Sequence, residues 1–163
     1  NQAGTVLGIA LQAEHDDPAL RQAAPVHARF DGQVLRTEPR VGNAAPTGAN
    51  APMEAPVPPM QSPTNLQGYG GSIVATPHGW AVSCPKAGCA VLFNAQGQRT
   101  GQMALAEVCA LASDGSKLWA GGLGQSLLQQ WPPGEPGSTQ PLAHPGALQG
   151  ARLDNHWGLV RGA

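Results

Sequence analysis

The stretch ATPHGWAVS, residues 75–83, decides the fold, because its pattern recurs twice further along the chain. ASDGSKLWAGG (residues 112–122) and ARLDNHWGLVRGA (residues 151–163) follow the same order of apolar segment, polar turn and apolar segment. Their tryptophans, Trp80, Trp119 and Trp157, are 39 and 38 residues apart. A repeat of this length, with short strands separated by Gly, Pro, Asn and Asp turns, is typical of β-propeller blades.

The repeat predicts two complete blades, each an antiparallel sheet of four strands. In the first we expect strands at residues 72–75, 80–84, 90–94 and 99–105. In the second we expect them at residues 108–112, 118–122, 126–131 and 139–143. Upstream, the segment VHARFDGQVLRT resembles AVLFNAQGQRT and aligns Phe30 with Phe93, which adds part of a preceding blade.

The predicted fold class is therefore all-β, with about three blades of a β-propeller, a ring that usually has four to eight blades. The expected divisions are a partial blade with a rim loop at 1–37, a proline-rich inserted loop at 38–67, full blades at 68–106 and 107–147, and a partial blade at 148–163. Three blades cannot close a ring. We therefore expect the remaining blades in another chain or in another part of the precursor, and two apolar faces that need covering.

Composition excludes several classes of protein. The chain has 22 Gly and 16 Pro, which leaves little room for long helices. Its net charge is −1 and its nine Lys and Arg are scattered, which argues against nucleic acid as a partner. The longest apolar run, TVLGIAL at residues 5–11, is too short to span a membrane.

Metal-ligating side chains gather in two predicted turns. The first turn holds Glu14, His15, Asp16 and Asp17, and the second holds Asp154 and His156. Carboxylates with imidazoles suit Fe, Mn or Zn, and carboxylates alone suit Ca²⁺. If both turns lie on one rim of the propeller, they can supply a single divalent ion.

A second interpretation of these turns needs no metal. Asp, Asn and His are common turn residues, because their side chains bond to their own backbone. Asp17 followed by Pro18 also reads as the cap and first turn of a short helix.

Two of the three cysteines flank a turn. Cys84 and Cys89 enclose the sequence PKAG, so they are expected to lie opposite each other on a hairpin. A disulfide in an oxidising compartment and two reduced core thiols are both compatible with this position. Cys109 is expected to be free and buried.

Four segments in order resemble the C-terminal half of a bacterial family, domain of unknown function 1513. They are GIALQAEHDD, GYGGSIVATPHGWAVSCP, EVCALA and LDNHW. The resemblance implies a seven-bladed propeller of the YVTN/WD40 type, exported to the periplasm and encoded near imelysin-like iron-uptake lipoproteins. The chain departs from the family pattern in the turn after the GYGGSI strand, which is usually serine-rich and is here SCPKAGC, and at Ala110, where Gly is usual.

Two functions follow from these observations. The first is a non-enzymatic periplasmic module that binds or scaffolds a protein partner, in iron handling, as the resemblance implies. The alternative is a metal-dependent hydrolase of the lactonase type, for which Glu14, Asp154 and Asn155 have suitable side chains. The sequence has no nucleophile elbow and no phosphate-binding loop, which favours the first function.

Overall fold

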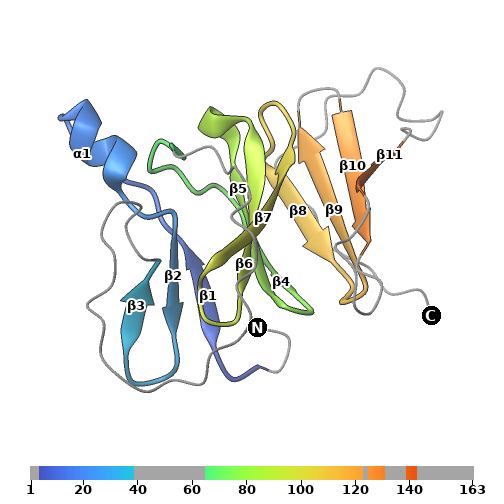
Figure 1. Ribbon diagram of the computed structural model, residues 1–163, viewed down its shortest axis with the longest axis horizontal. Helices are drawn as coiled ribbons and strands as arrows, with labels where there is room; N and C mark the ends of the chain where they lie inside the picture. The colour runs from blue at the N-terminus through green and yellow to red at the C-terminus, as the bar shows by residue number, and fades with distance from the viewer. Residues whose placement is uncertain (1–3, 39–64, 123–124, 131–138, 143–163) are drawn as a thin grey trace.

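The computed structural model describes residues 4–38, 65–122, 125–130 and 139–142. Within these ranges the chain forms three antiparallel sheets that stand side by side (Figure 1). The first blade is β1 (Leu7–Ala10), β2 (His27–Phe30) and β3 (Leu35–Thr37). The second is β4 (Ile73–Thr76), β5 (Gly79–Cys84), β6 (Cys89–Asn94) and β7 (Arg99–Ala104). The third is β8 (Ala110–Ser113), β9 (Lys117–Gly122), β10 (Gln125–Gln130) and β11 (Thr139–Leu142).

The strand order confirms an all-β fold of propeller-like blades. In every sheet, each strand pairs with the next one along the chain. Successive sheets also touch in sequence order, because β1 contacts β4, and β4 and β5 both contact β8. The eight strands predicted for the two full blades begin and end within two residues of the observed bounds. Of the proline-rich loop predicted at 38–67, residues 39–64 lie outside the described residues, as does the last partial blade, predicted at 148–163.

The first hairpin of the third blade, β8–β9, repeats the first hairpin of the second blade, β4–β5, at a spacing of 38 residues. Ala75 lies opposite Trp80 in the second blade, and Ser113 lies opposite Leu118 in the third. Leu118, not Trp119, is therefore the counterpart of Trp80. The predicted equivalence of Trp80 and Trp119 is wrong by one residue, and a slip of one residue moves a side chain to the other face of a sheet.

The first blade corresponds to the last three strands of the second. Leu7 lies opposite Phe30, as Trp80 lies opposite Phe93, so β1 is the counterpart of β5 and β2 that of β6. The predicted alignment of Phe30 with Phe93 agrees with this register. Among the described residues, no strand of the first blade takes the place that β4 takes in the second.

Apolar side chains fill the spaces between neighbouring blades. Strand β5 illustrates the arrangement, because its alternate side chains enter different clusters. Trp80 and Val82 join the cluster between the first and second blades, and Ala81 joins the cluster between the second and third. Burying a side chain as large as Trp80 contributes about 3 kcal/mol of stability. The second blade is thus held by the first and third blades on its two sides.

A short helix, α1 (Pro18–Ala23), lies in the connection between β1 and β2. Asp17 caps this helix, because its Oδ1 accepts a hydrogen bond from the Ala19 N–H at 2.8 Å. This confirms the predicted helix start at Asp17 and Pro18. No helix within the described ranges is long and apolar enough to cross a membrane.

Candidate binding cleft

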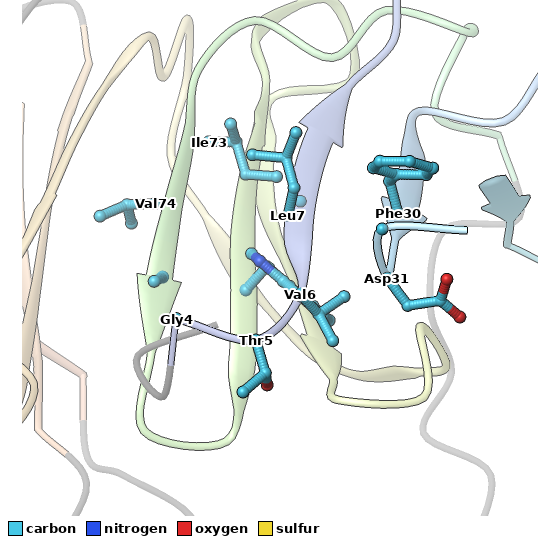
Figure 2. A pocket seen from close by; sticks show the side chains of 12 residues that line it. Gly4, Thr5, Val6, Leu7, Phe30, Asp31, Ile73 and Val74 are labelled. Atoms are coloured by element: carbon cyan, nitrogen blue, oxygen red, sulfur yellow. The ribbon is translucent and has the colours of Figure 1, made fainter. Parts of the chain in front are cut away.

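A cleft of about 550 Å³ lies beside β1 (Figure 2). It is walled by three parts of the chain that are distant in sequence and meet where the first blade packs on the second. These are residues 4–8, residues 30–32, and residues 73–75 together with Trp80. Most of the lining side chains are apolar, so the cleft suits an uncharged apolar ligand.

Gly8 allows β1 to lie close to the second blade. A Cβ at this position would come within 2.3 Å of the Trp80 Nε1 atom, so a side chain here would force the indole ring or the strand to shift. Larger and smaller residues alternate in the segment TVLGIAL, residues 5–11. At Gly8 the small residue is required by the packing of β1 on Trp80. Leu7, the preceding residue, points to the opposite face and is 59% exposed.

Asp31 is the acidic residue of the cleft, and its carboxylate is already bonded. Its Oδ1 accepts hydrogen bonds from the Gln33 and Val34 N–H groups at 3.0 and 2.8 Å, and its Oδ2 pairs with Arg36. These backbone N–H groups, helped by Arg36, hold the pKa of Asp31 below its usual range. In Figure 2 the carboxylate points away from Leu7 and Ile73. Asp31 therefore shapes the turn between β2 and β3.

A buried ion pair joins the first two blades. Glu38 is 5% exposed, and its Oε1 accepts a hydrogen bond from the Val26 N–H at 2.6 Å. Its Oε2 accepts from Arg99 Nε at 2.8 Å. The Glu38 carboxylate thus accepts hydrogen bonds from the backbone of the first blade and from the Arg99 guanidinium of the second blade. This pair fixes where the second blade packs on the first.

His27 is fully buried at the same interface. Its ring stacks on Phe93 with centroids 4.5 Å apart and lies 5.1 Å from the Trp80 ring. Neither ring nitrogen has a hydrogen-bond partner among the described residues. Burial, and secondly the charge of Arg29, lower the pKa of His27 to about 4. His27 is therefore neutral at pH 7 and acts as a packing residue.

The four predicted metal ligands of the rim loop are all exposed. Two of them organise their own turn, because the Asp17 N–H donates to His15 Nδ1 at 3.1 Å and Asp17 caps α1. Within the described residues, no group of three or more His, Cys, Asp or Glu side chains is placed to hold a metal. Asp154, Asn155 and His156 lie outside the described residues, so the shared metal site stays a prediction.

Cys84 and Cys89 lie directly opposite each other at the end of the β5–β6 hairpin, as predicted. The structure has both as buried free thiols. Burial, and secondly the neighbouring Cys89, raise the pKa of Cys84 to about 12, and burial also raises the pKa of Cys89. Such thiols are poor nucleophiles. Cys109 is free as predicted, but it is half-buried rather than buried.

Sequence reasoning did not find the cleft. The signal available for it was the small–large alternation of residues 5–11, which indicates close packing against a neighbouring blade. The Glu38–Arg99 pair was also missed, because it joins residues 61 positions apart.

Most of the chain matches a family of known sequences. Residues 9–160 match the model of a family described as Protein of unknown function (DUF1513). No curated protein and no solved structure matches the chain.

Proposed function

The chain belongs to the DUF1513 family, and we propose that it is a non-enzymatic binding module that docks a β-sheet of a partner on its first blade. The observation that carries this proposal is an exposed apolar row across that blade. The row consists of Leu7, Phe30 and Leu35, which we call the outer row.

Strand register places the outer row on one face of the sheet. Leu7 lies opposite Phe30, and Phe30 lies opposite Leu35, so the three side chains are neighbours on that face. Their exposed fractions are 59%, 36% and 58%. Gly8, on the other face, packs on Trp80 of the second blade, so the outer row faces away from the second blade.

The second blade shows what covers such a row. Trp80 and Phe93, the counterparts of Leu7 and Phe30, are 2% and 1% exposed because the first blade packs on them. Gly8 and His27 of the first blade pack against Trp80, and His27 also stacks on Phe93. The partner on the outer row is therefore a β-sheet that packs on Leu7 and Phe30 in the corresponding way. Further blades, in another chain or in the same precursor, fit this description.

We also propose that the module acts in the periplasm and takes part in iron handling. The support for both is the family resemblance of the rim-loop and GYGGSI segments. Binding of Fe, Mn, Zn or Ca by the rim loop is part of the same proposal. Calorimetric titration of Mn²⁺ and Zn²⁺ tests it, with Glu14→Ala as the variant and Glu107→Ala, an exposed carboxylate in another blade, as the control.

The described residues offer no support for the hydrolase alternative. Asp154 and Asn155 lie outside the described residues, and no observation on the described ones brings Glu14 near a second metal ligand from another blade.

Sedimentation velocity over a concentration series tests the docking proposal, with a second copy of the chain as the probe. We expect the wild-type chain to self-associate through the outer row, and Leu35→Lys to weaken this association at least tenfold. Val34→Lys is the matched control, because Val34 is 44% exposed on the same blade but is not part of the row. A wild-type chain that sediments as a monomer throughout, or equal effects of both variants, would contradict the proposal.

A further inference from the structure

We propose that the cleft accepts an extended polypeptide segment, which adds to β1 as an antiparallel strand. This inference rests on the proposed binding function and names a second contact with the partner. It involves backbone hydrogen bonding along the edge of the sheet, whereas the outer row involves packing on its face. The two contacts can therefore be tested separately.

The other blades show that this strand position is normally paired on both sides. Strand β5 lies between β4 and β6, and β9 lies between β8 and β10. Strand β1, their counterpart, pairs with β2 on one side. Among the described residues, no strand lies along its other side from Leu7 to Ala10. Such an edge presents backbone donors and acceptors that pair readily with an added strand.

The cleft adjoins this edge at Leu7 and Gly8, the two residues of β1 that line it. Its walls include β1 and the neighbouring β4, so a strand added to β1 would lie beside β4. This is the relationship that β4 itself has with β8, because the two inner strands of the second and third blades touch. The added strand would thus continue an interface that the molecule already contains.

Strand β1 offers four residues of this edge, which is also the length of β4 and β8. After Ala10 the Leu11 N–H donates to the Val26 carbonyl at 2.9 Å, and the Leu11 carbonyl accepts from the Gly70 N–H at 2.8 Å. Residues 68–70 therefore meet the chain on the side of β2 and, within the described part of the chain, leave the other edge of β1 open.

The lining of the cleft defines the chemistry of the occupant. Strands β4 and β8, which fill this place in the other blades, have the sequences IVAT and ALAS. Both lack charged residues and combine small with branched apolar side chains. The acidic Asp31 is paired with Arg36 and is not available to a ligand cation. The expected occupant is therefore an uncharged four-residue segment with apolar residues, in extended conformation.

A fluorescently labelled peptide tests the inference. The probe is Gly-Ser-Ile-Val-Ala-Thr, the sequence of residues 71–76, titrated with the folded chain and followed by fluorescence anisotropy. We expect saturable binding that weakens at least tenfold when alternate amides of the peptide are N-methylated, because methylation removes the donors but keeps the side chains. Equal binding of the methylated peptide, or no saturable binding of the parent peptide, overturns the inference.

Protein variants separate the edge from the face. Leu7→Lys places a charge on the edge strand and is expected to weaken peptide binding at least tenfold. Because Leu7 also belongs to the outer row, Leu35→Lys, which changes the row but not the lining of the cleft, should leave peptide binding unchanged. Val34→Lys is the control, because Val34 does not line the cleft. If the peptide fails to bind while the chain still self-associates through the outer row, the strand inference fails and the proposed function stands. If self-association is absent but the peptide binds, the proposed docking through the outer row fails and the strand inference stands.

Discussion

Leu7 in the first blade and Trp80 in the second occupy the same place in their sheets. Each lies directly opposite a phenylalanine, and each points away from the blade that follows in the chain. Trp80 is 2% exposed and Leu7 is 59% exposed. The difference arises because another blade covers Trp80, which is the reason to regard the surface around Leu7 as a docking face.

The contact between Gly8 and Trp80 predicts that Gly8→Ala destabilises the chain. The added methyl group would meet the indole ring, and overpacking of this kind costs about 1–3 kcal/mol. Urea denaturation measures the loss in the free energy of unfolding. The double variant Gly8→Ala with Trp80→Leu is the control, because a smaller side chain at 80 should accommodate the methyl group. Equal losses with and without Trp80 would contradict the steric explanation.

The Glu38–Arg99 pair predicts a cost for Glu38→Gln. The glutamine oxygen can still accept from the Val26 N–H, but it loses the charge that pairs with Arg99. Removing one partner of a buried pair is strongly destabilising, and partial exposure of Arg99 reduces this to roughly 2 kcal/mol. Arg36→Gln, which breaks an exposed pair with Asp31, should have a smaller effect in the same denaturation experiment.

His27 predicts a pH dependence of stability. Its pKa is about 4 in the folded chain and near 6.5 when unfolded, so between these values the unfolded chain binds a proton that the folded chain does not. The free energy of unfolding should therefore fall as the pH drops from about 6.5 toward about 4, by up to roughly 1.4 kcal/mol per pH unit.

Denaturation of His27→Phe at several pH values checks this origin. Phenylalanine keeps a stacked ring beside Phe93 but has no proton to bind, so the variant should lose this part of the slope. His78→Gln, which changes an exposed histidine in the turn between β4 and β5, should keep it. An unchanged slope in His27→Phe would assign the pH dependence to other groups.

The burial of the thiols predicts an order of alkylation. Cys84 and Cys89 are buried and their pKa values are raised, whereas Cys109 is half-buried. Iodoacetamide should therefore modify Cys109 first in the native chain, and peptide mass spectrometry identifies the site. In urea the three thiols should react alike. Early modification of Cys84 or Cys89 in the folded chain would show that the β5–β6 hairpin opens readily.

Much of the fold could be predicted from the sequence, because turn residues and short apolar segments recur at a regular spacing. Trp80 and Trp119 show where this reasoning fails. Matching the two tryptophans gives a spacing of 39, but the hairpin register makes Leu118 the counterpart of Trp80. Side chains alternate between the faces of a strand, so the error of one residue assigns Trp119 to the wrong face.

The candidate site was less predictable, because it depends on contacts between blades. The cleft exists where β1 meets β4, and these strands are separated by more than sixty residues. His27 reads in the sequence as an ordinary residue of an apolar strand, and its stacking on Phe93 appears only when the blades are placed together. Local patterns predict strands and turns well, but they do not predict which faces stay uncovered.

The most direct test of the docking face is a photo-crosslinker placed on it. With p-benzoylphenylalanine in place of Leu35, irradiation at concentrations where the chain associates should give a crosslinked product of two chains. The same group in place of Val34, which lies beside the outer row in sequence but not on it, should give little product. A strong crosslink from position 35 and a weak one from position 34 is the result that the docking face predicts. Equal yields at the two positions, or none at position 35, would contradict it.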